Sequence, residues 1–244
     1  LGVLYGLLQT GDVVFSDELN HASIIDGCRI SRCKVVVYKH NDMADLQRLL
    51  ETEIVTGQRF IVTDGVFSMD GDIADLPSLA VLKKQFNAFL IVDDAHGVGV
   101  IGNDGSGTAS HYGLTDVIDL QVGTLSKALA AEGGYVAGKK ILIDYLINRS
   151  RPFIFSTALA PATLAAANAA LLLLQTQASK YLDSLRANSR LMRRLLLEGG
   201  LNVVEGITPI IPVVIGEAGL TMQFADRLKS KGILVSGIRP PTVP

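Results

Sequence analysis

The sequence predicts an α/β fold built on a mostly parallel sheet with helices on both of its faces. Short apolar runs alternate with stretches in which apolar residues recur at helical spacing. The apolar runs are nearly continuous, which is typical of strands that a parallel sheet buries on both faces. A chain of 244 residues that is 48% hydrophobic is also long and apolar enough for one large core and part of a second.

Polar residues come just after the third, fourth and fifth expected strands. The strands are expected at 13–15, 35–38, 60–63, 89–92, 117–122 and 135–137, and the expected helices between the first four are 20–31, 43–53 and 76–86. Ligands of such sheets bind at the carboxyl ends of the strands, so the polar residues that follow the strands are the candidates for a site. These residues are Asp64, Asp93, Asp94, His96, Thr124, Ser126 and Lys127.

The pattern changes after Pro161. The expected elements beyond it are helices at 162–177 and 180–197, a strand at 209–215, a helix at 220–231 and a strand at 233–235. We therefore expect a large domain over residues 1–178 and a small α/β domain over residues 179–244. Because the chain begins without Met and stops in a proline-rich run, we expect the first domain to be truncated at its N-terminus and the second at its C-terminus.

Composition excludes several classes of function. With 22 Lys and Arg against 24 Asp and Glu, the formal charge of −2 provides no basic field for nucleic acid. The uncharged stretch 152–179 is interrupted by Pro161 and Asn168, so it is interpreted as a buried helix and not as a membrane span. Cys28 and Cys33 are interpreted as reduced thiols. We expect a cytoplasmic protein without a nucleic-acid or membrane partner.

Lys127 directly follows an apolar strand and small hydroxyl residues. Its amine could form a Schiff base while the hydroxyls of Thr124 and Ser126 hold a phosphate. The alternative is a surface lysine in a loop between a strand and a helix.

Asp93, Asp94 and His96 follow the fourth strand. A carboxylate at the end of a buried strand needs a partner such as a protonated pyridine nitrogen, and His96 could bond the ring hydroxyl of the same ligand. One alternative is that an aspartate caps the following turn. Another is a metal site, since carboxylates and an imidazole suit Mg, Mn or Zn. Its ligands would be drawn from Asp64, Asp70, Asp72, Asp93 and His96.

The remaining histidines differ in context. His21 follows a strand and begins a helix, where its ring could stack on an aromatic cofactor or simply start the helix. His40 and His111 have no supporting neighbours in the sequence and are expected at the surface. The glycine-rich segment 133–138 is not a phosphate-binding loop and is expected to form tight turns.

Seven segments, taken together and in order, resemble the α-oxoamine synthases, a family of fold-type I pyridoxal phosphate (PLP) enzymes. The segments are 19–23, 63–72, 92–99, 123–128, 133–138, 151–157 and 238–244. They span essentially the whole chain, and the order of all seven makes the resemblance specific. It implies a fold-type I PLP-dependent transferase and a homodimer with its site at the subunit interface.

The resemblance also implies roles for individual residues. Lys127 would form the internal aldimine and carry protons, and His21 and His96 would join it as catalytic residues. The cofactor would be held by Asp93 at the pyridine nitrogen, His96 at the ring oxygen, His21 on the ring face, Ser68 at the ring edge, and Thr124 at the phosphate, with Ser126 as a weaker phosphate ligand. Arg239 and Thr242 would lie near the acyl substrate or in a neighbouring subunit's site.

The implied reaction is a decarboxylative condensation of an amino acid with an acyl thioester. The ending 238–244 resembles the member that condenses L-alanine with pimeloyl-CoA, or pimeloyl carrier protein, in biotin synthesis. The nearest alternative condenses glycine with acetyl-CoA. A catalytically silent subunit of a heteromer and a metal-dependent hydrolase are the alternatives from other classes.

The chain departs from the family pattern in two ways. Ala130 stands where the family has glycine, which costs about 1 kcal/mol if that backbone needs a positive φ. The upstream aromatic loop that helps hold the phosphate and the downstream arginine segment that binds substrate are absent, so we expect this chain alone to be inactive.

Overall fold

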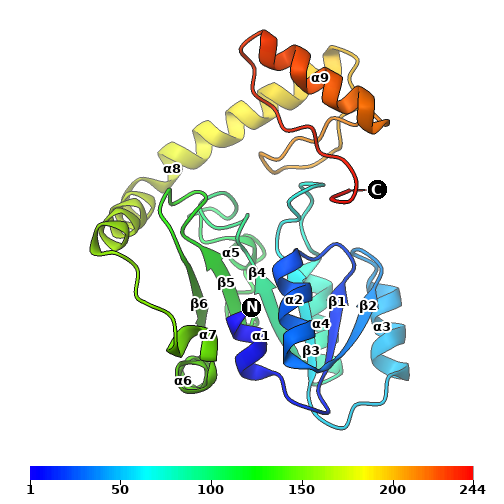
Figure 1. Cartoon of the computed structure of the whole chain (residues 1–244), viewed down its shortest axis with the longest axis vertical. Helices are drawn as coiled ribbons and strands as arrows, with labels where there is room; N and C mark the ends of the chain where they lie inside the picture. The colour runs from blue at the N-terminus through cyan, green and yellow to red at the C-terminus, as the bar shows by residue number, and fades with distance from the viewer. Residues whose placement is uncertain (244) are drawn as a thin grey trace. The chain divides into compact units, whose positions relative to one another are not determined.

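The computed structural model describes residues 1–243, so Pro244 of the last family segment lies outside the described residues. The described residues divide into two compact units. The first unit comprises residues 1–68 and 72–185, and the second comprises residues 69–71 with the chain from 186 onward (Figure 1).

The strands of the first unit form, within residues 1–243, one six-stranded sheet in the order β2-β1-β3-β4-β5-β6. Their bounds are β1 Val13–Asp17, β2 Lys34–Tyr38, β3 Arg59–Asp64, β4 Phe89–Asp93, β5 Leu120–Thr124 and β6 Gly134–Gly138. The first five strands pair in parallel and β6 pairs antiparallel with β5. The predicted fold class, a mostly parallel sheet with helices on both faces, is confirmed.

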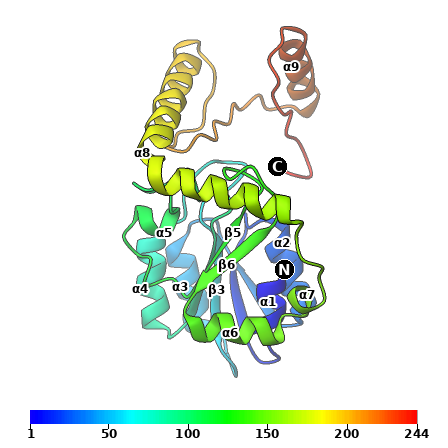
Figure 2. The same cartoon turned by 90° about the vertical axis from the view of Figure 1, so that its left-hand side faces the viewer.

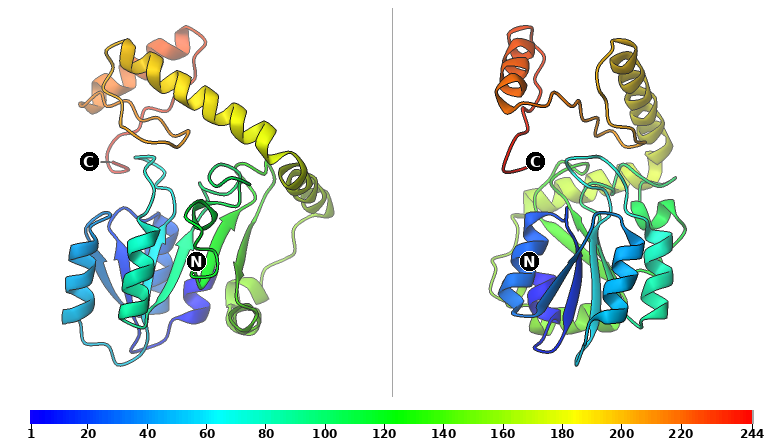
Figure 3. Two further views of the ribbon diagram at one scale, coloured as in Figure 1. Left: turned by 180° about the vertical axis from the view of Figure 1, so that it is seen from behind. Right: turned by 90° about the vertical axis from the view of Figure 1, so that its right-hand side faces the viewer.

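Two helical layers cover the sheet, and the alternation of side chains along the strands explains both. Val13 and Phe15 point to one face, where they pack with α3 (Met43–Thr52), α4 (Leu76–Gln85) and α5 (Thr108–His111). Val14 points to the other face, with α1 (Gly2–Leu7), α2 (Ala22–Ser31) and α6 (Lys140–Arg149). Figure 2 views the sheet from its β6 side, between the two layers. Figure 3, on its left, shows α3 and α4 from behind.

The starts of three helices are capped by side chains that the sequence supplies. His21 accepts a hydrogen bond from the Ser23 backbone N–H at the start of α2, at 3.2 Å. Asp42 and Asp75 accept the backbone N–H groups three residues on, at the starts of α3 and α4. Because a cap satisfies a backbone donor that the helix leaves unpaired, each helix begins at a fixed residue beside its strand.

The long helix α8 (Pro161–Glu198) agrees with the prediction in where it is interrupted. Its helical geometry breaks at Gln177, with φ −136°, close to the expected break between two helices. However, only Ala167 and Leu182 are buried in it, and the leucines at 171–173 are exposed, so the expectation of a buried helix is wrong for this chain. Within residues 1–243 no helix combines the length and the apolar character that crossing a membrane requires.

In the second unit, the predicted helix is present as α9 (Ala218–Ser230), but the two strands predicted there are wrong. Residues 209–215 contribute only the isolated bridge between Val203 and Val213 to the described structure. Pro209 and Pro212 lack the N–H donor that a strand interior needs, which explains the difference. At 233–235 no strand is assigned, and Leu234 is 85% exposed.

Other differences lie in the first unit. β5 begins at Leu120 and not at Val117, because the N–H groups of Val117 and Ile118 donate to Leu114 O in a turn. The sequence did not predict α1, α5, α6 or α7 (Arg151–Ile154).

Candidate functional site

The candidate residues gather where β3, β4 and β5 end side by side. Asp64 ends β3 and is paired in register with Asp93, which ends β4. Asp93 is in turn paired with Val122 of β5, two residues before Thr124. The parallel register therefore brings the polar residues after three separate apolar runs to one edge of the sheet.

Asp93 has an open acceptor at this edge. It is half-buried, and its carboxylate accepts one hydrogen bond in the described structure, from the Ala95 backbone N–H at 3.1 Å. Burial raises the pKa of Asp93, while the Ala95 N–H and the charges of His21 and Lys127 act to lower it. A half-buried carboxylate with spare acceptor capacity suits a cationic or N–H partner.

The carboxylate of Asp94 is used in hydrogen bonds that hold the fold. It is fully buried and accepts the backbone N–H of Thr108 at 2.7 Å, the hydroxyl of Thr108, and Nε2 of Gln121 at 2.8 Å. Burial raises its pKa, and these bonds oppose the increase. Of the two adjacent aspartates, Asp94 anchors the loop at Thr108, and Asp93 is the one with capacity for a ligand.

Asp64 fixes the backbone of His21. The backbone N–H of His21 donates to Asp64 Oδ2 at 2.8 Å, and the Asn20 side chain bonds both Asp64 N and Val62 O at 2.8 Å. Burial, and then the charge of Asp93, raise the pKa of Asp64 to about 7. The imidazole of His21 is exposed at the start of α2, where its Nδ1 caps the helix, so the residue is held in place while the face of its ring is open to a ligand.

Thr124 ends β5, and Ser126 and Lys127 follow it. The hydroxyls of Thr124 and Ser126 lie 2.7 Å apart, and Thr124 also donates to Gly133 O at 3.1 Å. Lys127 is exposed, and its amine makes no hydrogen bond or ion pair within residues 1–243. Its charge nevertheless acts on the pKa values of Asp64, Asp93 and His96, which places the amine in the same electrostatic environment as all three.

Ala130 closes the loop that carries Lys127. Its N–H donates to Lys127 O at 3.0 Å, and its φ is +48°. The left-handed backbone that the family's glycine suggested is therefore present, with alanine in it. The loop stores conformational strain of about 1 kcal/mol.

His96 and Ser68 are both half-buried. Burial, followed by the charges of Lys127 and His21, lowers the pKa of His96, so its imidazole is neutral at neutral pH. A neutral imidazole both donates and accepts a hydrogen bond, as the predicted bond to a ring oxygen requires.

A cavity of about 480 Å³ opens on the sheet face covered by α1 and α6 and reaches this edge. Asp93, Ser23, Gly123 and Tyr135 are among its lining residues, and the rest of the lining is largely apolar. A Cβ at Gly123 would lie 2.3 Å from Cζ of Tyr135, so a side chain there would displace the tip of the tyrosine ring. Lys127 and His96 do not line the cavity.

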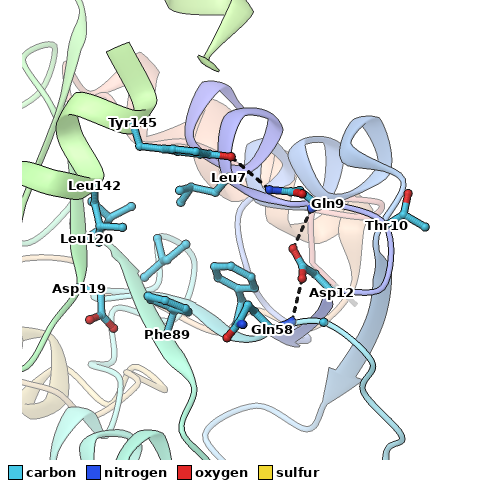
Figure 4. Close-up of a pocket in the computed structure, with 13 residues that line it drawn as sticks. Leu7, Gln9, Thr10, Asp12, Gln58, Phe89, Asp119, Leu120, Leu142 and Tyr145 are labelled. Carbon is cyan, nitrogen blue, oxygen red and sulfur yellow. Dashed lines mark hydrogen bonds between the residues drawn. The ribbon is translucent and has the colours of Figure 1, made fainter. Parts of the chain in front are cut away.

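Another cavity, of about 460 Å³, lies at the opposite edge, where the strands begin (Figure 4). Figure 4 shows the carboxylate of Asp12 between Gln9 and Gln58, whose backbone N–H groups it accepts, each at 2.8 Å. None of the residues predicted for the site lines this cavity.

The expectation that His40 lies unsupported at the surface is wrong. Its Nδ1 lies 3.0 Å from Asp17 Oδ1 and its Nε2 lies 2.9 Å from Asp72 Oδ2. The ring also packs edge-on against Phe67 at 4.4 Å. Since a carboxylate only accepts, both ring nitrogens carry a proton, and these bonds raise the pKa of His40 to about 10 against the opposing effect of burial. His111 is exposed, as expected.

The metal alternative receives no support from the arrangement of its predicted ligands. Asp72 bonds His40, Asp64 holds the His21 backbone, and Asp70 is exposed. No group of three or more His, Cys, Asp or Glu side chains in residues 1–243 is arranged to hold a metal ion.

Arg239 and Thr242 belong to the second unit. The guanidinium of Arg239 donates to Sδ of Met222 at 3.1 Å and to Gly237 O at 3.3 Å, and Thr242 N donates to Arg239 O. Both residues are exposed and share one turn, so the substrate role that the family resemblance implies for them stays a prediction.

Sequence reasoning missed Gln121 and Thr108, the two residues that anchor Asp94 beside the site. Each is paired with a partner far along the chain, so no local pattern marks it. The only available signal was the burial expected for Asp94, which requires donors somewhere in the fold.

Comparison with known protein families identifies the chain. The model of the family described as aminotransferase class I and II matches residues 2–244. The chain belongs to this family. Curated relatives include 8-amino-7-oxononanoate synthases from Lysinibacillus sphaericus, 49% identical over 244 residues, and Geotalea daltonii, 52% identical over 245 residues. Both matches cover all of this chain and 62% of the relative, so the chain spans less than two thirds of these relatives' length.

Solved structures of the same family share the fold. Serine palmitoyltransferase from Sphingomonas wittichii superposes with a TM-score of 0.95 at 30% identity, covering 100% of this chain and 61% of that one. A serine palmitoyltransferase structure described as containing a PLP internal aldimine gives the same TM-score and identity. The 8-amino-7-oxononanoate synthase from Francisella tularensis has a TM-score of 0.84 at 32% identity, covering 99% and 70%. The predicted fold-type I transferase fold and the resemblance to α-oxoamine synthases are confirmed.

Proposed function

We propose that this chain is the core of a PLP-dependent C-acyltransferase that condenses L-alanine with pimeloyl-CoA, or with a pimeloyl carrier protein, to 8-amino-7-oxononanoate and CO2. The identity of 49% and 52% to curated synthases of that name supports the choice of substrates. The observation that carries the proposal is the placement of Asp93 at the end of β4 and of Lys127 just after the neighbouring β5, within electrostatic reach of each other.

The residues at the strand ends suit PLP. Asp93 has the open, half-buried carboxylate that a protonated pyridine nitrogen needs. The paired hydroxyls of Thr124 and Ser126 suit the phosphate, and Lys127 has a free amine to hold the aldehyde carbon through a covalent C=N bond. His21 would stack on the ring face, His96 would bond the ring oxygen, and Ser68 would line the ring edge.

When bound, PLP supplies an electron sink for negative charge that develops at the amino acid's Cα. The amine of Lys127, once displaced by substrate, would remove the Cα proton and later return it. Asp93 would keep the pyridine nitrogen protonated so that the sink operates. Neutral His96 would orient the ring through its oxygen, and the exposed ring of His21 would limit the tilt of the cofactor. Arg239 and Thr242 would bind the acyl substrate.

The cofactor assignment can be tested on the full-length protein. We expect bound PLP to give the visible absorbance of a lysine-linked cofactor, and borohydride to bleach it and mark Lys127 by mass. Lys127→Ala should abolish both the absorbance and turnover. Lys139→Ala is the matched control, because this exposed lysine follows β6 at the opposite edge of the sheet, and it should keep the absorbance. Retention of absorbance and turnover by Lys127→Ala would overturn the assignment.

The substrate assignment needs a different assay, because glycine C-acetyltransferase, which joins glycine and acetyl-CoA, would use the same cofactor chemistry. Release of CoA is followed while L-alanine and glycine are crossed with acetyl- and pimeloyl-thioesters. The proposal predicts the largest kcat/KM for L-alanine with the pimeloyl thioester. A preference for glycine with acetyl-CoA would show that the protein is a glycine C-acetyltransferase instead, and it would leave the cofactor assignment intact.

We further propose that the full-length protein is a cytoplasmic homodimer. Exposed leucines at 171–173 provide apolar surface for burial in a larger assembly, and the free thiols of Cys28 and Cys33 fit a reducing compartment. Light scattering coupled to size exclusion tests the dimer, and cell fractionation tests the location.

A further inference from the structure

Cys28 and Cys33 stand together at the C-terminal end of α2. This helix ends with Arg32 in the left-handed conformation at φ 58°, and the Arg32 N–H donates to Arg29 O at 3.3 Å. In a helix end of this kind, the residue after the left-handed one comes into contact with the residue five positions before it. In this chain those residues are Cys33 and Cys28, so the turn itself brings the thiols together.

The contacts at this turn are close. The thiols of Cys28 and Cys33 are close enough that each shifts the pKa of the other, and Sγ of Cys33 lies 3.9 Å from Cys28 O. The hydroxyl of Ser31 lies 3.3 Å from Sγ of Cys33 and donates to Cys28 O at 2.7 Å. Cys28 is only 2% exposed, whereas Cys33 is half-buried and can be reached from solvent.

The environment makes the thiols unequal. Hydrogen bonds from Cys28 and Ser31 lower the pKa of Cys33 to about 6, against the effect of burial. The same bond, and then burial, raise the pKa of Cys28. Cys33 is therefore the more acidic of the two thiols and the one that solvent reaches, so it is the nucleophile of the pair, while Cys28 is held as a thiol beside it.

We propose that Cys28 and Cys33 form a reversible intramolecular disulfide with small disulfides such as glutathione disulfide as the oxidant. The Cys33 thiolate attacks one sulfur of the oxidant, giving a mixed disulfide and one released thiolate. Cys28, which then no longer donates to a thiolate, loses its proton to solvent and attacks the Cys33 sulfur. The second small thiolate leaves, so two protein thiols are oxidised and one small disulfide is reduced to two thiols.

This site is separate from the proposed cofactor chemistry. Cys28 lies in the last turn of α2 (Ala22–Ser31) and Cys33 just beyond it, whereas His21 caps the opposite, N-terminal end of the helix. Formation of the disulfide is therefore measured without any assay of activity, and its failure would leave the proposed function untouched.

The experiment equilibrates the full-length protein in glutathione buffers from fully reduced to fully oxidised, quenches it with acid and alkylates the free thiols. Trypsin cleaves after Arg29 and Arg32, between the cysteines. A disulfide therefore leaves the dipeptide Cys33-Lys34 attached to the Cys28 peptide, two hydrogens lighter than the sum of the reduced peptides. We expect this linked pair to replace the alkylated peptides as the oxidised fraction increases, and dithiothreitol to reverse the change.

Single variants separate the steps. Cys28→Ser should stop at the mixed disulfide, with glutathione on Cys33, and Cys33→Ser should leave Cys28 unmodified because the buried thiol is not reached first. The proposal is overturned if wild-type Cys28 and Cys33 remain alkylatable at every ratio. It is also overturned if Cys33 of the wild type accumulates glutathione while Cys28 stays free.

Discussion

At the scale of single residues, the adjacent carboxylates of Asp93 and Asp94 differ in how many hydrogen bonds they already accept. Asp93 and Asp94 are adjacent and both have a raised pKa, but Asp94 is saturated by Thr108 and Gln121. Only the family resemblance singled out Asp93, because a strand-end pattern shows a carboxylate without showing its donors. Because of this difference, the same substitution by asparagine should lower turnover at Asp93 and lower stability at Asp94.

Asp93→Asn should keep the fold and bind PLP, but lower kcat by about 100-fold or more, since an amide cannot hold the pyridine nitrogen protonated. Its thermal midpoint without cofactor should match the wild type, because Asp93 accepts a single backbone bond. Turnover within a few-fold of the wild type would contradict the role given to Asp93.

Asp94→Asn is the matched variant. It places an NH2 group against the donors of Thr108 and Gln121, so the free energy of unfolding should fall by about 1–3 kcal/mol. Urea denaturation measures the loss. Equal stability of the two variants would show that Asp94 does not anchor this loop.

At the scale of elements, the sequence predicted best where the physical cause was local. The first four strands were found from their apolar runs. The carboxyl ends of β3, β4 and β5 bring Asp64, Asp93 and Thr124 to one edge of the sheet, as expected. The strand predicted at 209–215 failed where Pro209 and Pro212 removed donors that a ladder needs. The burial expected for α8 failed because burial depends on what packs against a helix, which its own periodicity does not show.

The loop after β5 provides a prediction at this scale. Ala130 has φ +48°, whereas Ala131 is not in the left-handed region. Ala130→Gly should raise the free energy of unfolding by about 1 kcal/mol, because glycine adopts this conformation without strain. Ala131→Gly is the control and should not stabilise the protein. Chemical denaturation measures both changes, and equal effects of the two substitutions would show that the strain at Ala130 is not significant.

At the scale of the whole molecule, charged groups far apart in the sequence make stability depend on pH in one direction. His40 bridges Asp17 and Asp72, which lie 23 residues before it and 32 after it, so sequence inspection could not reveal its partners. Asp64 is buried beside Asp93. Folding raises the pKa of both His40 and Asp64. At a pH between the unfolded-state pKa and the folded-state pKa of each group, the folded state therefore binds more protons than the unfolded state.

Stability falls as the pH rises through the titration of each group. Asp64, with its pKa raised from 3.8 to about 7, contributes stability that is fully present below pH 3.8 and lost as the pH rises to 7. His40, with its pKa raised from 6.5 to about 10, contributes stability that is fully present below pH 6.5 and lost as the pH rises through 10. The windows adjoin, so these groups together lower the stability of the cofactor-free protein steadily from mildly acidic to alkaline pH.

Matched variants separate the two windows. Asp64→Asn keeps an oxygen to accept the His21 N–H, and it should remove the pH dependence between 4 and 7, on the order of 4 kcal/mol. His40→Gln should remove the dependence between 7 and 10 and destabilise the protein by about 3 kcal/mol at pH 7, because it leaves buried Asp17 without its cationic partner. Denaturant titrations of the cofactor-free protein at each pH measure both. If the variants retain the wild-type pH dependence in their respective windows, the protons are bound elsewhere in the molecule.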